Sequence, residues 1–458
     1  MQLSTKTYTL TDFHLDILGQ QPRINRLYTQ ITLCFQLPGP YAQSEIVSIL
    51  KSGFDSLSEN FPWIAGKIGN EDDTFKIKPS VSENKSHIVV RDYTNDDSVP
   101  DWNALRKANF PFSMIDEPIF APCKTVEPDS EGLLVFIIQA NFVNGGGLLL
   151  TLNGQHGSMD MAGQSQMMYL LAKACRNEPF TDMELAIGNM DRQHILSLLH
   201  DPDTLDSYKP KEEGKQRQAE TTSPSSCTWT YFSFSATDLA SMKSEATSTI
   251  PSSGTCGFVS TDDVLSAFIW QSISRSRLPR YSTKPSASAA FMMTTLSRNV
   301  DVRRYLNIPP TYPGLVTNAT VHTSSLNDVV EQSIGVLSSQ LRTALDPISL
   351  SHRTRELATL LSKEKNAQNA TIVPKGVPEL DVRLSSWAKE KCYCLDFGFG
   401  LPAAVRRPRF TDGAREGLVY FLPKRLDGQI VVGICLREED MERLKGDEQF
   451  VRFGRYIG

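Results

Sequence analysis

The segment from Asp201 to Ser226 most constrains how this chain of 458 residues can fold. It reads DPDTLDSYKPKEEGKQRQAETTSPSS, with almost no apolar residues and much charge, serine and proline. A stretch of this composition cannot bury enough apolar surface to form a core of its own. We therefore expect an N-terminal domain over residues 1–200, an exposed crossover over 201–226 and a C-terminal domain over 227–458.

The composition favours an ordinary globular chain and argues against two kinds of partner. Hydrophobic residues make up 40% and charged residues 22% of the sequence, which is enough for two or three cores. The formal net charge of −5 leaves no domain-wide basic excess for a nucleic-acid backbone. No apolar run reaches the length of a membrane span. We expect a monomer that binds neither nucleic acid nor a membrane.

The cysteines and the first residues indicate a cytoplasmic protein. Eight cysteines are scattered without framework spacing, and the start MQLSTKTYTLTDF lacks the basic and apolar regions of a secretion signal. Cys392-x-Cys394 has no second pair with zinc spacing, and alternation along a strand explains it better. We therefore expect reduced thiols and no bound metal.

Apolar periodicity predicts alternating strands and helices in both halves of the chain. In the first half it predicts a helix over 44–58 and strands over 27–37, 87–90, 133–142 and 148–152. The residues Asn144-Gly145-Gly146-Gly147 join the last two strands as a hairpin, because glycine permits the positive φ angles of a tight reversal. In the second half the patterns predict strands over 228–234, 417–423 and 429–436 and helices over 261–276, 326–344 and 349–365.

An H-x-x-x-D motif, His156 to Asp160, stands where the apolar run 147–152 ends and the amphipathic stretch 161–175 begins. This pattern predicts a strand that delivers His156 to its end and a helix that starts with Asp160 as its N-cap. A glycine on either side of the pair Gln155-His156 leaves an open approach, which suits a general base. Chance alone gives on the order of half such a motif in a chain of this composition, so an incidental origin stays open.

A second informative stretch is Ser385-Ser386-Trp387, followed by the turn DFGFG at 396–400. With H-x-x-x-D, the run VSTDDVLSAFIW and the segment Asp301-Val302-Arg303, these motifs follow the order and rough spacing of plant and fungal acyl-CoA-dependent acyltransferases called BAHD. The chain resembles this family over nearly its whole length. It is especially similar to the fungal trichothecene 3-O-acetyltransferases in the runs NGQHGSMDMAGQ, LAKACRNEPFT, VSTDDVLSAFIW, YPGL and VRRP.

The resemblance implies two similar α/β domains of the chloramphenicol acetyltransferase type, each a mixed sheet with helices, and an active-site channel between them. Coenzyme A and the alcohol would enter by different mouths, and His156 would be the general base reached from both. Asp160 would pair with Arg303 and act through structure. Ser385 and Trp387 match positions that face the developing oxyanion in some plant members.

The resemblance also implies a purely supporting role for the turn that contains Asp396, Gly398 and Gly400, away from the active site. Plant members usually have tryptophan where this chain has Phe399, a difference that fungal relatives share in kind.

Basic side chains near the end of the 261–276 helix are candidates for binding the phosphates of coenzyme A. These are Arg275, Arg277 and Lys284, with Arg280 beside them. A solvated helix end explains the same charges equally well. No phosphate-loop or dinucleotide-binding glycine motif is present in the sequence, which removes the usual nucleotide folds.

These observations predict an acyl-CoA-dependent O-acyltransferase that acetylates a hydroxyl of a fungal secondary metabolite such as a sesquiterpenoid, with acetyl-CoA as co-substrate and no permanently bound cofactor. A thioester is already activated, so the protein must align the alcohol, remove its proton and stabilise the oxyanion. Direct transfer in a ternary complex is expected because no G-x-S-x-G elbow is present, and Ser158 is the one tempting alternative nucleophile. Two rivals stay open: a condensation-type enzyme that uses a carrier-protein thioester, and a catalytically silent binding paralogue.

Overall fold

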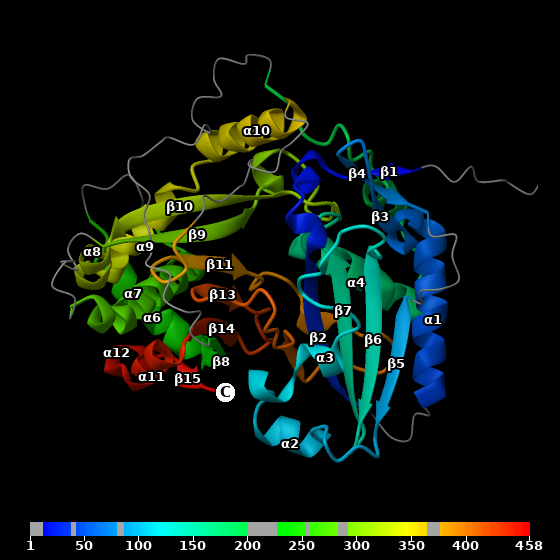
Figure 1. Cartoon of the computed structure of the whole chain (residues 1–458), viewed down its shortest axis with the longest axis horizontal. Helices are drawn as coiled ribbons and strands as arrows, with labels where there is room; N and C mark the ends of the chain where they lie inside the picture. Colours follow the sequence, from blue (N-terminus) through cyan, green and yellow to red (C-terminus); the bar gives the residue numbers. More distant parts are fainter. Residues whose placement is uncertain are drawn as a thin grey trace, which may run out of the picture.

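The computed structural model describes residues 12–37, 43–79, 87–199, 227–251, 257–282, 292–363 and 376–458. Two mixed sheets with helices organise this part of the chain (Figure 1). One sheet has five strands in the order β12-β2-β7-β6-β5, and the other has seven in the order β10-β9-β11-β13-β14-β8-β15. The predicted α/β architecture of two mixed sheets is therefore confirmed. The crossover predicted over 201–226 lies outside the described residues.

The N-terminal sheet is built on the predicted hairpin. β6 (Phe136–Val143) and β7 (Gly147–Gln155) pair antiparallel, and Gly145 and Gly146 turn between them at φ angles of +83° and +73°. β2 (Tyr28–Gln36) pairs antiparallel with β7, and β5 (Ile88–Tyr93) pairs parallel with β6. Every residue of β6 and β7 is buried, as expected for central strands.

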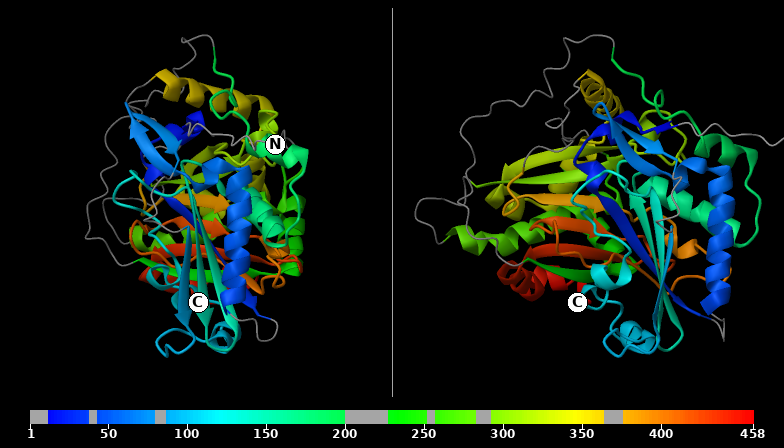
Figure 2. Two further views of the ribbon diagram at one scale, coloured as in Figure 1. Left: turned by 90° about the vertical axis from the view of Figure 1, so that its right-hand side faces the viewer. Right: turned by 45° about the vertical axis from the view of Figure 1, so that its right-hand side comes forward.

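Two long helices cover the N-terminal sheet. The apolar stripe of α1 (Gln43–Asn60) is buried, and α1 packs against α4 (Met161–Cys175). Gly53 permits this close approach, because a Cβ atom there would lie 2.4 Å from Cys175 Sγ. Figures 1 and 2 show α1 on the side of the sheet that faces away from the C-terminal half.

The C-terminal sheet is built from seven strands. They are β8 (Cys227–Phe234), β9 (Met293–Asp301), β10 (Thr317–Ser325), β11 (Val382–Ser386), β13 (Leu418–Phe421), β14 (Ile430–Arg437) and the short β15 (Arg455–Tyr456). β11 runs parallel to both of its neighbours, β9 and β13, and the other pairs are antiparallel. The core on this side is formed with α6 (Ala236–Ser248), α7 (Thr261–Ser282), α9 (Ile334–Thr343) and α11 (Glu438–Gly446).

The other strands and α-helices complete the two halves. They are β1 (Phe13–His14), β3 (Lys67–Glu71), β4 (Thr74–Lys78), α2 (Trp102–Lys107), α3 (Glu117–Phe120), α5 (Asp182–Gly188), α8 (Leu326–Glu331), α10 (Pro347–Lys363), β12 (Ala404–Arg406) and α12 (Glu448–Val451).

Three sequence predictions differ from the structure. The helix expected over 326–344 is two helices, α8 and α9, because the Ser333 side chain caps a new start by accepting from the Val336 N–H. The helix expected to end near residue 276 continues to Ser282. Residues Cys392–Cys394 form a 3-10 turn and not a strand, so strand alternation does not explain their spacing.

The two halves interlock through a segment that follows the DFGFG turn. β12 belongs to the C-terminal half in sequence but pairs with β2, with Ala404 opposite Cys34. The ring centroids of Phe397 and Phe399 lie 6.1 and 5.0 Å from that of Phe35 in the same strand β2. The C-terminal half therefore completes the edge of the N-terminal sheet.

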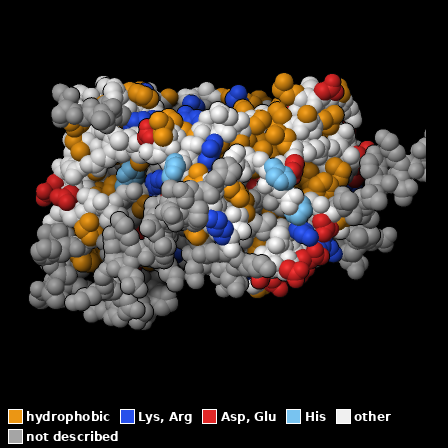
Figure 3. All heavy atoms as spheres, turned by 90° about the horizontal axis from the view of Figure 1, so that it is seen from above, with side chains coloured by type: hydrophobic (Ala, Val, Ile, Leu, Met, Phe, Trp, Pro, Cys, Tyr) orange, Lys and Arg blue, Asp and Glu red, His pale blue; other side chains and the backbone are white. Residues whose placement is uncertain are grey.

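The helices and the surface charge of the described part of the chain bear on two possible partners, a membrane and a nucleic acid. None of its helices has the length and apolar character needed to cross a membrane. On the face shown in Figure 3, basic and acidic side chains both occur in small groups among uncharged ones. The described residues visible there form no continuous basic tract of the kind that binds a phosphodiester backbone.

Candidate active site

His156 lies at the predicted strand-to-helix junction. Its backbone N–H donates to the Leu27 carbonyl at 2.8 Å, directly after the last pair of β7 with β2. Gly157 then starts the turn into α4, and a Cβ atom there would lie 2.1 Å from Asn25 Oδ1. The junction is therefore held by main-chain bonds and a close approach that requires glycine.

The His156 ring has one nitrogen engaged by the backbone. Nδ1 lies 3.3 Å from the Met159 carbonyl oxygen. Because a carbonyl only accepts hydrogen bonds, this contact requires the proton on Nδ1 and leaves the lone pair on Nε2. The histidine is partly buried and lines a pocket. Its Nε2 atom is thus suited to accept a proton.

The environment of His156 favours the neutral imidazole. Burial lowers the pKa of His156 below its usual value, and the nearby charge of Arg407 lowers it further. The Met159 carbonyl and Asp160 act in the opposite direction without restoring the usual pKa. The imidazole is therefore unprotonated at neutral pH, as a general base must be.

Asp160 and Arg303 form a buried, two-pronged ion pair. Arg303 Nη1 donates to Asp160 Oδ2 and Nη2 donates to Oδ1, both at 2.9 Å. The side chains are 5% and 1% exposed. The pair joins the start of α4 to the segment after β9, so it ties the two halves together.

Asp160 also accepts hydrogen bonds from two backbone N–H groups and one hydroxyl. Oδ1 accepts from the Gly163 N–H at 2.8 Å, which is the predicted N-cap of α4. Oδ2 accepts from the Val316 N–H at 2.8 Å and from Thr317 Oγ1 at 3.0 Å. Burial raises the pKa of Asp160, but Arg303 and the two backbone N–H donors outweigh it and hold the pKa below its usual value. Both oxygens are taken by protein donors, as expected of a structural carboxylate.

The pocket that contains His156 lies between the two halves. Its volume is about 300 Å³, and both halves supply its walls. From the N-terminal half come Tyr28 and Thr125, and from β9 come Ser297 and Asn299. A pocket between the two sheets is what the sequence resemblance implied.

Ser385 and Trp387 line the same pocket from β11 and the residue just beyond it. Ser385 stands opposite Tyr420 in the parallel pairing with β13. The backbone N–H of Trp387 donates to the Phe421 carbonyl at 2.8 Å. The indole is 4% exposed, with its ring centroid 5.2 Å from that of Tyr420. The structure thus brings both predicted residues to the pocket that His156 lines.

Ser158 does not line the pocket. It is fully buried, and its hydroxyl donates to the Gln155 carbonyl at 2.7 Å. The turn therefore uses Ser158 to close itself.

Asp396, Gly398 and Gly400 form a self-contained turn away from the pocket. Asp396 Oδ1 accepts from the Gly398 N–H at 2.8 Å and the Gly400 N–H at 2.9 Å. The two glycines have φ angles of +101° and +99°, which side chains rarely tolerate. Arg176 Nη1 donates to the Asp396 carbonyl, which links the turn to the end of α4.

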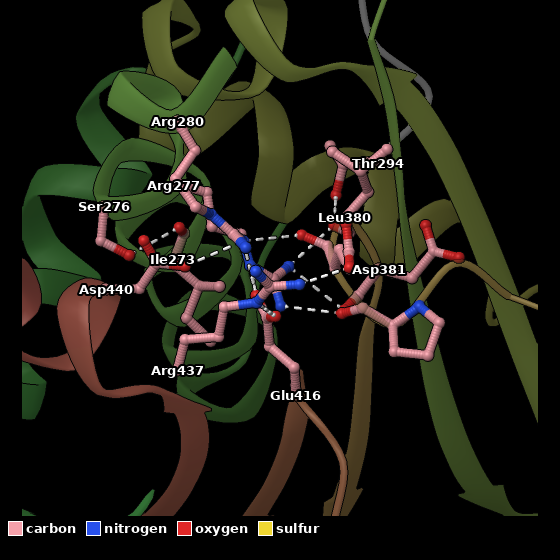
Figure 4. Close-up of polar contacts among 12 residues, drawn as sticks. Ile273, Ser276, Arg277, Arg280, Thr294, Leu380, Asp381, Glu416, Arg437 and Asp440 are labelled. Carbon is pink, nitrogen blue, oxygen red and sulfur yellow. Dashed lines mark hydrogen bonds and ion pairs between the residues drawn. The ribbon is translucent and has the colours of Figure 1, made fainter. Parts of the chain in front are cut away.

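The arginines near the end of α7 that were predicted to bind phosphate contact carboxylates and carbonyls of the protein instead. Arg277 is fully buried, donating to Glu416 Oε1 at 3.0 Å and to the Leu380 carbonyl at 2.8 Å (Figure 4). Arg275 Nη1 pairs with Asp447 Oδ2 at 2.7 Å. Neither lines the pocket, so the structure does not bring these two residues to the site that His156 lines. Lys284 lies outside the described residues.

A cluster of arginines that the sequence analysis missed lies on the pocket instead. Arg23, Arg383 and Arg415, here called the pocket arginine cluster, come from three separate segments and all line it. Arg23 is exposed and the other two are half-buried, so the cluster lies where the pocket meets solvent. Burial and the charges of Arg415 and Arg23 lower the pKa of Arg383 to about 10. No local signal marked these residues, because their convergence depends on the fold.

Glu390 and Arg407 are two further pocket residues that the sequence analysis did not single out. Burial raises the pKa of Glu390 to about 7, and Asp160 and Asp301 raise it too. Arg407 is 3% exposed. The run VRRP contains Arg407 and was noted for its similarity alone, so a signal was present without an assigned role.

The two mixed sheets with a pocket between them have the architecture of a BAHD-type acyltransferase. The family model for the trichothecene 3-O-acetyltransferase-like N-terminal domain matches residues 27–175. An O-acetyltransferase dmxR13 of Cryptosporiopsis sp. is 44% identical, covering 98% of each chain. The trichothecene 3-O-acetyltransferase TRI101 of Fusarium sporotrichioides is 42% identical, covering 98% of this chain and 97% of its own.

A solved structure agrees with these sequence relatives. F. graminearum TRI101 complexed with coenzyme A and deoxynivalenol superposes with a TM-score of 0.89 at 38% identity, covering 98% of this chain and all of its own. The chain belongs to the family of trichothecene 3-O-acetyltransferase-like enzymes.

Proposed function

We propose that this enzyme transfers an acetyl group from acetyl-CoA to a hydroxyl of a fungal secondary metabolite such as a trichothecene-like sesquiterpenoid. The observation that carries the proposal is the placement of His156. Its Nδ1 donates to the Met159 carbonyl, and its ring lines a pocket between the two sheets. The complex of F. graminearum TRI101 with coenzyme A and deoxynivalenol supports both substrate classes.

The proposed reaction needs one base and one oxyanion site. Nε2 of His156 takes the alcohol proton as the alcohol oxygen attacks the thioester carbonyl, which forms a tetrahedral oxyanion. The carbon–sulfur bond then breaks, and the departing thiolate receives the proton from His156. Ser385 and Trp387 carry the donors proposed for the oxyanion, and Asp160 acts by fixing the junction that holds His156.

The acyl group passes directly between the two bound substrates. Ser158 is buried and donates to a backbone carbonyl, which supports a route without an acetyl-enzyme. Enzyme mixed with acetyl-CoA alone should then release no stoichiometric burst of thiol and should gain no acetyl mass.

The enzyme is proposed to act as a cytoplasmic monomer.

The phosphates of acetyl-CoA are proposed to bind the pocket arginine cluster. Three guanidinium groups at the solvent end of the pocket repel one another, and an anionic ligand would relieve that repulsion. Guanidinium groups bind phosphate with two parallel hydrogen bonds. This assignment replaces the one based on Arg275 and Arg277.

The test is a screen of hydroxylated sesquiterpenoids, deoxynivalenol included, with purified enzyme and acetyl-CoA. Thiol release that depends on the alcohol, together with a product heavier by one acetyl group, is the expected result. Absence of alcohol-dependent thiol release across the panel, while the protein is folded and binds coenzyme A, would favour the silent paralogue. Activity only with a thioester on a carrier protein would favour the condensation-type enzyme.

A further inference from the structure

Two adjacent arginines at β12 are both buried but differ in what they contact. Arg406 and Arg407 are each 3% exposed. The guanidinium of Arg406 donates to the carbonyls of Phe110, Val405 and Asn109 at 2.8–2.9 Å. All three of its nitrogens are thus used by the backbone, so Arg406 serves the fold.

Arg407 instead lines the pocket and is held mainly by aromatic faces. Its guanidinium carbon lies 4.5 Å from the ring centroids of Phe410 and Tyr420, and 5.8 Å from that of Trp387. Nη2 donates to Thr125 Oγ1 at 3.2 Å. Nε is buried and has no hydrogen-bond partner among the described residues. The rings fix a planar cation and leave part of its donor capacity unused.

No carboxylate of the described residues forms an ion pair with Arg407. The acidic side chain linked to it is Glu117, through Thr125, whose hydroxyl donates to Glu117 Oε1 at 2.5 Å and accepts from Arg407. A buried cation without a contacting anion is costly to maintain. Such a charge is expected where an anion develops or binds.

In the proposed reaction, the oxyanion forms in the same part of the pocket. The oxyanion must lie near the indole of Trp387 if that group is one of its donors, and the guanidinium of Arg407 faces that ring. Arg407 is also close enough to His156 for its charge to lower the pKa of the imidazole. Arg407 therefore lies near both reacting groups.

We propose that Arg407 is a catalytic residue whose fixed positive charge stabilises the oxyanion formed when the alcohol attacks the thioester. The inference rests on the proposed acetyl transfer. The charge is present before the reaction and is held by ring faces, so it needs no reorganisation as the negative charge develops. A second effect follows from the same position: the charge keeps the imidazole of His156 unprotonated at lower pH.

The central experiment compares Arg407→Gln with Arg406→Met, its neighbour of equal burial. Removing a preorganised oxyanion-stabilising group costs on the order of 10²–10³-fold in turnover. Arg407→Gln should therefore lower kcat by that factor. It should change the KM for acetyl-CoA and the KM for the alcohol by less than about threefold each. The acid limb of its pH profile should move to higher pH, because the charge that lowers the pKa of His156 is gone. Arg406→Met should lower the melting temperature but leave the kcat of the folded fraction and the acid limb in place.

Two further variants keep the inference testable if Arg407→Gln folds poorly. Arg407→Lys keeps the charge and should retain more turnover than Arg407→Gln. Arg407→Ala leaves a cavity, and added guanidinium ion should restore part of its kcat without raising its melting temperature.

Three results would overturn the inference. They are wild-type kcat in Arg407→Gln, a rise in the KM for the alcohol at unchanged kcat, and a loss of kcat that guanidinium does not rescue and that matches the loss of folded protein. In each case, acetyl transfer by the wild-type enzyme would still support the proposed function. Failure of the proposed role of Arg407 is therefore distinguishable from failure of the proposed function.

Discussion

Two groups of arginines in this protein differ in what neutralises them. Behind the C-terminal sheet, Arg277, Arg280 and Arg437 share Glu416, with contacts of 2.6–3.0 Å, and Arg280 also pairs with Asp440 at 2.8 Å (Figure 4). In the pocket arginine cluster, no carboxylate of the described residues pairs with Arg23 or Arg415. The first group is complete within the protein, whereas the second concentrates positive charge where a ligand can enter.

The pKa directions follow the same division. Burial lowers the pKa of Arg437, but Glu416 and Glu379 outweigh it and raise the pKa above its usual value. Burial and Arg23 lower the pKa of Arg415. Charges that stabilise each other indicate a structural network, and charges that destabilise each other beside a pocket indicate a ligand site. We therefore expect changes to side chains on the pocket to slow the reaction or weaken substrate binding. Changes to the paired side chains should lower the stability of the fold.

The largest expected effect is that of His156→Ala. Loss of the general base should lower turnover by on the order of 10²–10⁴-fold, because proton removal from the alcohol then depends on water. The melting temperature should stay close to that of the wild type, since among the described residues the ring makes one hydrogen bond, the long one with the Met159 carbonyl. Steady-state kinetics and thermal unfolding measure both. Near-wild-type turnover would remove the central claim.

Asp160→Asn should act on stability and activity together. The change breaks a buried pair and leaves Arg303 uncompensated, which costs about 3–5 kcal/mol in the free energy of unfolding. Denaturant unfolding measures this loss. If activity collapsed while the free energy of unfolding was unchanged, Asp160 would belong with the catalytic groups, and the comparison would fail at this residue.

Arg383→Gln and Arg277→Gln test the comparison on one residue type. Hydrogen bonds to a charged group contribute about 1.5–3 kcal/mol, so Arg383→Gln should raise the KM for acetyl-CoA on the order of 10–100-fold. Arg277→Gln should instead lower the melting temperature and leave that KM unchanged.

Truncated donors show which phosphate the pocket arginine cluster binds. Acetyl-dephospho-CoA lacks the 3′-phosphate and acetyl-pantetheine lacks every phosphate. The KM ratio between Arg383→Gln and wild type should shrink towards one with the donor that lacks the contacted phosphate. An unchanged ratio with acetyl-pantetheine would separate the cluster from the phosphates.

The smallest expected effect is a shift in pH dependence. The base form of His156 is required, and burial and Arg407 hold its pKa below the usual value despite Asp160. Activity should therefore fall only as the pH drops below about 6.5. Glu390, with a pKa of about 7, also titrates on the pocket, so Glu390→Gln is the control that isolates the His156 limb. A limb of kcat/KM that stays above 6.5 in this variant would contradict the assignment.

Local patterns predicted the parts of the site that depend on neighbouring residues. The glycine pair that turns the β6–β7 hairpin, the end of β7 at His156 and the N-cap by Asp160 were all predicted. Each depends on interactions within about one turn of chain, such as the bond from the Gly163 N–H to Asp160. The break between α8 and α9 was missed, because the cap by Ser333 interrupts an otherwise continuous apolar stripe.

The tertiary structure alone decided which charges are paired. Arg277 and Glu416 are 139 residues apart in sequence, and Arg23 is still farther from Arg383, so no sequence window contains either relationship. Arg406 and Arg407 are neighbours, yet backbone carbonyls surround one and aromatic rings hold the other. The sequence determined that a histidine would stand at the end of a strand. Whether a given arginine serves the fold or the ligand depended on what the distant segments brought beside it, because ion pairing requires contact in space.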